Sequence, residues 1–224
     1  MSVPRAVSFF LIAAILTSTA AFAAPKAAKP RAPRPPCKHE SMVTLTLGSE
    51  APRDVYQKVA DAGSMVGLSA GFRVTHWLAA GMDFSYMRNA GTHHGASLTV
   101  PSDPSTGKPT TVTLVENWTI TNLGAYARVF VAERGRFAPY VRLGVGDYSI
   151  RYSQDVSAAT AATSLSGVEQ ASKPGISGGL GLRFRVLGGT SLGLEVVYHD
   201  IFLHDTRMNM LTTGVTLGFG PAGN

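Results

Sequence analysis

Hydrophobic and polar residues alternate with a period of two along eight stretches of the chain, each about as long as a β-strand. One face of each stretch carries Val, Leu and aromatic residues, and the other carries Gly, Ser, Thr and a few charges. Successive side chains of a strand point to opposite faces, so each stretch is predicted to be a strand with two unlike faces. The predicted strands are residues 42–48, 65–74, 78–87, 119–131, 138–150, 175–186, 191–200 and 212–219.

The joins between these strands alternate in length. Three are tight turns, at residues 75–77, 132–136 and 187–190. Four are longer, at residues 49–64, 88–118, 151–174 and 201–208. Short periplasmic turns and long external loops are typical of outer-membrane β-barrels. An even number of strands puts both termini on the side of the short turns, so we expect both termini in the periplasm.

Alternation alone does not separate a membrane barrel from a soluble β-sandwich or a lipocalin-like barrel, which have their apolar face inside. Aromatic residues near both ends of the strands favour the membrane barrel, because such residues gather where bilayer meets water. The outer girdle is expected at Tyr86, Trp118, Tyr148 and Tyr198, and the inner girdle at Phe72, Trp77, Phe137 and Phe219.

The N-terminal segment is typical of a secretory signal peptide, with Arg5, an apolar core at residues 9–16 and an Ala-x-Ala site at residues 21–23. The remaining chain has no apolar run of ~18 residues, the length a membrane helix needs. We predict a signal peptide at 1–24, a flexible basic Pro-rich periplasmic tail at 25–40, the barrel at 41–219 and an overhang at 220–224.

The net charge of +6 arises before the first predicted strand. Six of the 20 basic residues precede that strand, which leaves 14 against the 14 acidic residues of the chain. A formally neutral barrel gives no reason to predict nucleic-acid binding. Cys37 is the single cysteine, so it is either a free thiol or part of an intermolecular disulfide, and we favour the free thiol.

The last predicted strand carries a further pattern at Thr212, Gly214, Leu217 and Phe219, which reads polar, any, Gly, any, any, hydrophobic, any, hydrophobic. This pattern resembles the C-terminal signal by which outer-membrane barrels are recognised for insertion. The resemblance implies the barrel-assembly machinery as a partner, and outer-membrane lipid and lipopolysaccharide as surroundings. We expect this strand to pair with residues 42–48, because an open edge would leave unpaired amides in lipid.

Two segments, Asn-Leu-Gly-Ala-Tyr at 122–126 and Ala-Pro-Tyr-Val-Arg-Leu-Gly-Val-Gly at 138–146, resemble the outer-membrane protein β-barrel domain family of small OmpA/OmpW-like proteins. The resemblance covers about residues 41–219. It implies an all-β, eight-stranded, antiparallel, up-and-down transmembrane barrel that is porin-like and monomeric. It leaves the role open, since the family includes adhesins, anchors and small channels.

Charged residues on the small-residue face are expected inside the barrel, among them Asp83, Arg128, Arg142, Arg183 and Glu195. Counting back from Gly188-Gly189 places Arg183 and Glu195 almost opposite each other on neighbouring strands, where opposite charges attract. We hypothesise an ionic plug in which Glu195 neutralises Arg183, with Arg128 or Arg142 contributing.

The predicted role is therefore structural, or a surface interaction through loops 49–64, 88–118 and 151–174. A narrow passive channel is the alternative, and a lipid A-modifying enzyme is a third. Within the long loop 88–118, residues 97–100 and 111–115 are β-prone and predict a hairpin above the membrane that binds a partner by β-augmentation. The Ala/Ser/Thr-rich residues 153–172 are expected to be a mobile loop.

Other candidate chemistry is weak. The adjacent pairs His199-Asp200 and His204-Asp205 are expected at the outer rim, a suitable height for lipid A chemistry, with Ser85 on another strand. His93-His94 in a loop lacks the arrangement of a metal site. No catalytic residue, metal ligand or cofactor is predicted.

Overall fold

The computed structural model describes residues 41–93, 95–100, 110–131, 136–158, 161–186 and 189–220. The predicted signal peptide (1–24), the tail (25–40) with Cys37, His94 and the last four residues lie outside the described residues. In the described part of the chain, no helix is both long enough and apolar enough to cross a membrane.

The described residues form nine strands and one short helix, and each predicted period-two stretch coincides with a strand, three of them ending one residue beyond it. The elements are β1 (Ser41–Arg53), η1 (Tyr56–Lys58), β2 (Gly63–Arg73), β3 (Leu78–Ala90), β4 (Ser97–Val100), β5 (Thr110–Phe130), β6 (Phe137–Ala158), β7 (Ala161–Arg185), β8 (Thr190–Phe202) and β9 (Arg207–Phe219).

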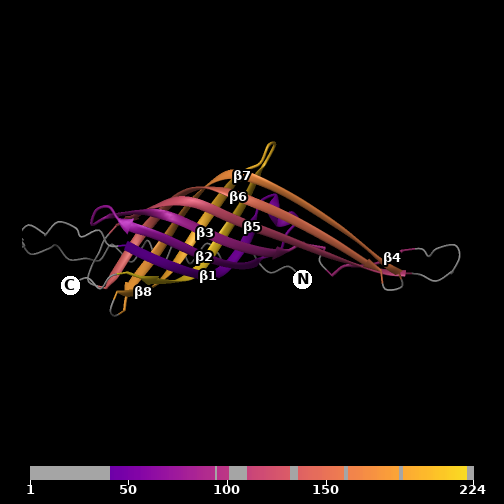
Figure 1. The fold of residues 1–224 in the computed structure, drawn as a ribbon, viewed down its shortest axis with the longest axis horizontal. Coiled ribbons are helices and arrows are strands. Elements are labelled where there is room, and N and C mark those ends of the chain that lie inside the picture. The colour runs from indigo at the N-terminus through magenta and orange to yellow at the C-terminus, as the bar shows by residue number, and fades with distance from the viewer. Residues whose placement is uncertain are drawn as a thin grey trace, which may run out of the picture. The chain divides into compact units, whose positions relative to one another are not determined.

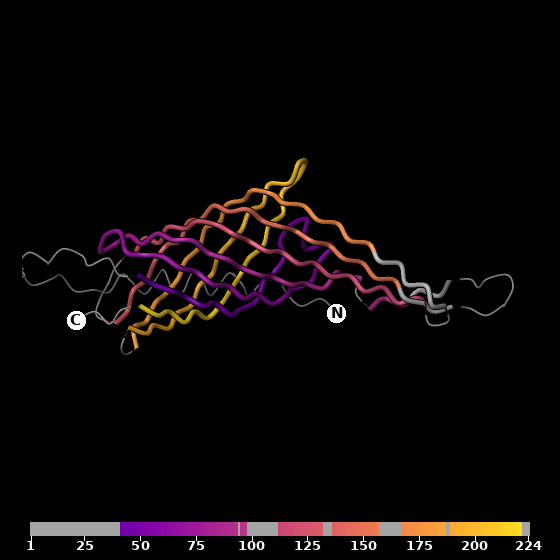
Figure 2. The backbone as a smooth tube through the Cα atoms, in the orientation of Figure 1, coloured from indigo at the N-terminus to yellow at the C-terminus, as the bar shows by residue number. Residues whose placement is uncertain are grey.

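Eight of these strands close into an antiparallel barrel (Figures 1 and 2). Each pairs with its neighbour along the chain, β3 pairs with β5, and β1 pairs with β9. The closing ladder runs from Val43 opposite Phe219 to Arg53 opposite Asn209. The predicted pairing of the last strand with residues 42–48 is confirmed, and with it the eight-stranded up-and-down barrel.

The apolar face of the wall points outward. Leu180, Leu143 and Met82 are 64%, 61% and 59% exposed, whereas the inward-facing Thr44 and Thr216 are 4% and 5% exposed. A barrel in water would expose the opposite face, so this inverted distribution is that of a wall surrounded by hydrocarbon. The soluble sandwich and the lipocalin-like barrel are thereby set aside.

The two ends of the barrel differ, and we name them the turn end, where β1 begins, and the loop end, where β1 finishes. Two predicted long loops are wrong at the loop end. The join 201–208 is a tight turn closed by the amide of Leu203 donating to Thr206 at 3.0 Å. The join 151–174 consists mostly of strand, because the β6–β7 ladder continues to Ser157 opposite Ser164.

This continuation produces a sheet that stands above the barrel. It comprises residues 97–100, 110–116, 153–158 and 161–174, and we call it the blade. Its ladders run from Ser97 opposite Thr113 in β4 and β5 across to β6 and β7. The predicted hairpin of residues 97–100 with 111–115 is confirmed, and the ends of β5, β6 and β7 extend toward β4 in Figure 1.

The narrow lumen explains the glycines of the inward face. A Cβ atom on Gly181 would lie 2.2 Å from the ring of Tyr140, and one on Gly175 would lie 2.7 Å from the ring of Tyr148. These approaches are far below van der Waals contact, so each tyrosine ring occupies the space above a glycine.

The girdle prediction is right for the outward aromatics and wrong for two others. Tyr86 and Tyr198 are about 40% exposed near the loop end. The rings of Trp118 and Tyr148 face the lumen instead, because both occupy positions of inward parity on β5 and β6.

Candidate functional site

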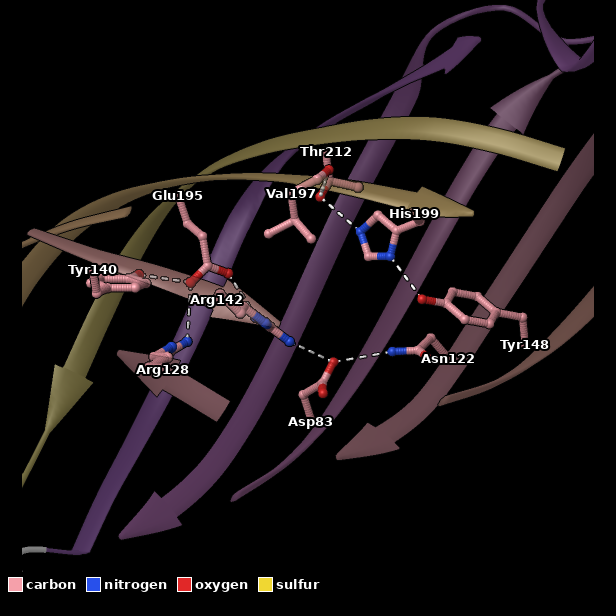
Figure 3. A network of polar contacts seen from close by, with 10 residues as sticks. All are labelled: Asp83, Asn122, Arg128, Tyr140, Arg142, Tyr148, Glu195, Val197, His199 and Thr212. Carbon is pink, nitrogen blue, oxygen red and sulfur yellow. Dashed lines mark hydrogen bonds and ion pairs between the residues drawn. The ribbon is translucent and has the colours of Figure 1, made fainter. Parts of the chain in front are cut away.

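Glu195 of β8 is the centre of a buried ionic cluster in the lumen. Its Oε1 lies 2.7 Å from Nη1 of Arg142 on β6, and its Oε2 lies 3.2 Å from Nη2 of Arg128 on β5. The hydroxyl of Tyr140 also donates to Oε2 at 2.7 Å. All four side chains are buried, so the carboxylate exchanges water for two guanidinium groups and a phenol (Figure 3).

Asp83 of β3 extends the cluster across the lumen. Its Oδ2 lies 2.9 Å from Nη2 of Arg142 and accepts a hydrogen bond of 3.1 Å from the amide of Asn122 on β5. Arg142 therefore bridges Glu195 and Asp83 (Figure 3). Two arginines against two carboxylates make the cluster formally neutral, which lowers the cost of burying the charges.

Arg183 occupies a different place from the one the sequence predicted. The register sets Arg183 opposite Gly193 and Glu195 opposite Gly181, so the two charges are offset by two residues. Arg183 contacts the sulfur of Met42 at 3.2 Å, and its guanidinium lies 4.9 Å from the centre of the Phe130 ring. The expected direct opposition is wrong, whereas Arg128, Arg142 and Asp83 do lie together with Glu195.

The arginines also pack on aromatic rings. Arg128 lies over Tyr126 at 4.7 Å and over Tyr140 at 5.2 Å from the ring centres. Nearer the turn end, Arg73 lies over Phe130 at 4.6 Å. Such contacts stabilise a guanidinium away from water, so the rings complete the surroundings that the carboxylates begin.

His199 belongs to the lumen rather than to the outer rim. Its Nδ1 lies 2.9 Å from the hydroxyl of Tyr148, and its Nε2 lies 3.1 Å from that of Thr212 (Figure 3). Both ring nitrogens are thus occupied, and Ser85 lines the same small cavity as His199. His204 and Asp205 lie 3.6 Å apart in a turn where both side chains are 92% exposed.

Above His199 the lumen is filled by an apolar cluster that the sequence analysis missed. Its buried members include Tyr56, Met87, Ile120, Ile201 and Met210. Helix η1 carries Tyr56 into the cluster, where its ring meets that of Trp118 edge-on at 5.6 Å. The sequence did contain a signal for this cluster. Alternate residues of β3, β5, β8 and β9 face the lumen, and these residues change from polar to apolar toward the loop end.

Little space remains between these layers. The cavity lined by Asp83, Ser85, Arg142, Glu195 and His199 has a volume of about 30 Å³, and another beside Arg183 has about 10 Å³. A water needs roughly 10–15 Å³ by such a measure. Within the described residues, no group of three His, Cys, Asp or Glu side chains is placed to hold a metal ion.

Comparison with known proteins agrees with this architecture. Residues 11–221 match the family model described as the outer membrane protein beta-barrel domain. The chain belongs to this family. It is therefore an outer-membrane β-barrel protein. No curated protein matches the chain.

Solved structures of outer-membrane proteins are similar to the chain at low sequence identity. OprG from Pseudomonas aeruginosa is 11% identical, with a TM-score of 0.50, over 83% of this chain and 97% of that one. The attachment invasion locus protein Ail of Yersinia pestis is 14% identical, with a TM-score of 0.46, over 82% of this chain and all of that one. At 11% identity the similarity to OprG concerns the fold alone.

The residues of the predicted assembly signal lie on β9, each on the face expected from the alternation of side chains along a strand. Thr212 is 3% exposed inside the lumen, and Phe219 is 50% exposed on the outer face. Gly214 lies opposite Gly48 of β1, and Leu217 lies opposite Leu45. Their use as a signal stays a prediction.

Proposed function

We propose that this protein is a sealed outer-membrane barrel whose role is surface interaction through the blade. The observation that carries the proposal is the continuation of β5, β6 and β7 beyond the barrel wall. Pairing of β7 with β8 stops at Gly175 opposite Ile201, but β7 still pairs with β6 through residues 161–174. A rigid sheet projecting from a barrel is a surface suited to partners.

The edge of this sheet suggests how a partner would bind. Residues 167–174 of β7 pair with β6 on one side, and β8 does not reach them on the other. An extended segment of a partner would add a strand there by backbone hydrogen bonds. In this proposal both termini lie in the periplasm and the blade lies outside the cell. The barrel is a monomer.

The filled lumen supports an anchoring role over a channel. The ionic cluster spans β3, β5, β6 and β8, and the apolar cluster with Tyr56 lies above it. Solutes would have to displace both layers. The enzyme alternative gains no support from His199, whose ring nitrogens are bonded to Tyr148 and Thr212.

Two measurements test this function. Planar-bilayer recording of the purified wild type should give no steady single-channel conductance. Cells displaying the wild type should bind members of an array of extracellular-matrix proteins and polysaccharides, whereas cells displaying a variant with residues 154–169 replaced by Asn-Gly should not. The variant should still insert, because the barrel ladders remain.

Steady conductance together with equal array binding by the wild type and the trimmed variant would contradict the proposal and favour the passive channel. The matched control replaces His204 and Asp205, both 92% exposed in the β8–β9 turn, by Asn-Gly, which leaves the blade and the lumen complete. This control should retain array binding.

A further inference from the structure

Two grooves adjoin on the outward face of β3, β5, β6 and β7. The first has a volume of about 560 Å³ and a polar lining that includes Arg88, Thr119, Thr121, Ser149, Arg151 and Gln170. The second has about 600 Å³ and an apolar lining that includes Met82, Leu123, Ala125, Val145, Ile176 and Phe202. Each volume suits a drug-sized group or an acyl chain.

The strand register places the polar groove directly above the apolar one. Thr121 and Leu123 are successive outward positions of β5, and they belong to the polar and the apolar groove respectively. One step above Thr121, Thr119 lies opposite Arg88 of β3 and Arg151 of β6. The two grooves therefore form one amphipathic track that runs from the apolar band to its polar border.

The two arginines flank this track. Both are exposed, and one strand separates them, so their Cα atoms lie roughly 10 Å apart. Neither has a hydrogen-bonded or ion-paired partner among the described side chains. Two guanidinium groups at this spacing can hold one phosphate between them, because each presents a planar fork of donors.

The acidic residues nearby leave the arginines available. Asp155 lines the same groove but is four residues from Arg151 along β6, roughly 13 Å at strand spacing. Asp147 lies two outward positions below Arg151 and accepts a hydrogen bond from Ser172. The groove near Thr119 is therefore positive, with hydroxyl groups on Thr119, Thr121 and Ser149.

We propose that this track binds one phosphorylated, acylated glycolipid of the outer leaflet. Arg88 and Arg151 hold its phosphate, the Thr and Ser hydroxyls contact its sugar, and one acyl chain fills the depression over Ala125. The small side chain of Ala125 lies between Met82 and Val145 in the register and forms the floor of that depression. The assignment to the outer leaflet rests on the proposed orientation, with the blade outside the cell. The binding itself does not depend on that orientation.

Native mass spectrometry of the full-length barrel in detergent, titrated with lipid A, tests this site. The wild type should retain one lipid A. Arg88→Gln/Arg151→Gln should bind it about tenfold or more weakly, since the two exposed charge-assisted contacts together contribute at least about a tenfold factor. Arg53→Gln/Lys58→Gln removes two exposed charges from β1 and η1 and should bind as the wild type does.

Three further arms separate a lipid site from a phosphate site. Dephosphorylated lipid A should bind weakly to the wild type, and Ala125→Phe should weaken lipid A binding by filling the apolar groove. Inorganic phosphate at millimolar concentration should not displace lipid A. Equal retention by the arginine and control variants, or full displacement by phosphate, would overturn the proposal. Conductance and array binding do not enter this measurement, so it fails independently of the proposed function.

Discussion

At the scale of single residues, Glu195 holds the lumen together because it neutralises two arginines at once. Glu195→Ala should destabilise the barrel by about 3–5 kcal/mol, since it leaves Arg128 uncompensated and Arg142 with Asp83 alone. Urea unfolding in lipid vesicles, followed by tryptophan fluorescence, measures this loss. Glu169→Ala removes an exposed carboxylate of the blade and should change stability by less than about 0.5 kcal/mol.

The double variant Arg128→Ala/Glu195→Ala makes the test specific. Its loss should be smaller than the sum of the two single losses by about 0.5–3 kcal/mol, because the two groups contact each other. Simple additivity would mean that Glu195 acts on stability through something other than this ion pair.

The position of Arg183 shows how far residue-level prediction reached. Parity placed Arg183 and Glu195 on the same inner face, and that is correct. The turn between β7 and β8 set the register, with the amide of Val186 donating to Thr190 at 3.0 Å and Gly189 at a φ of 86°. This loop shifts the pairing by two residues, which preserves the face but changes the partner.

At the scale of elements, β9 is the strand that closes the barrel, and it is predicted to be the one that the assembly machinery recognises. Phe219→Ala should reduce insertion into outer membranes, whereas truncation after Phe219 should leave it unchanged or improved. Heat-modifiable gel mobility of membrane fractions measures the inserted share. Val215→Ala truncates another outward residue of β9, 55% exposed, and serves as control.

Normal insertion of Phe219→Ala, or an equal defect in Val215→Ala, would mean that the terminal aromatic is not the recognised feature. The register makes the comparison fair, since Phe219 and Val215 both lie opposite residues of β1 and β8.

The membrane strands and the β4–β5 hairpin were predictable from the sequence, whereas the β6–β7 part of the blade was not. A strand in the barrel wall separates lipid from lumen, so its residues alternate. Residues 153–156 and 167–172 have no such boundary, because both of their faces are at least partly exposed. Their ladder continues from the barrel, and the small and polar residues there show no period that distinguishes a strand from a loop.

At the scale of the whole molecule, the exposed apolar residues of the outer face can lie against either lipid or water, and the cost of placing a charge there depends on which it is. Leu180 and Val168 of β7 are 64% and 54% exposed, so their exposed fractions do not distinguish them. They differ in position, because Leu180 pairs within the barrel wall and Val168 lies in the blade. We therefore expect Leu180 to lie in hydrocarbon and Val168 in water.

Arginine at these two positions should therefore have different costs. Leu180→Arg should destabilise the barrel in lipid vesicles by about 2–4 kcal/mol, because a charge on the lipid face loses its hydration at mid-membrane depth. Val168→Arg should cost less than about 0.5 kcal/mol, as an exposed surface substitution does. Urea unfolding in vesicles of the same lipid compares them directly. Equal urea midpoints for the two variants would mean that both residues lie in the same solvent. The border of the membrane would then not lie between Leu123 and Thr121, where the amphipathic track changes from apolar to polar.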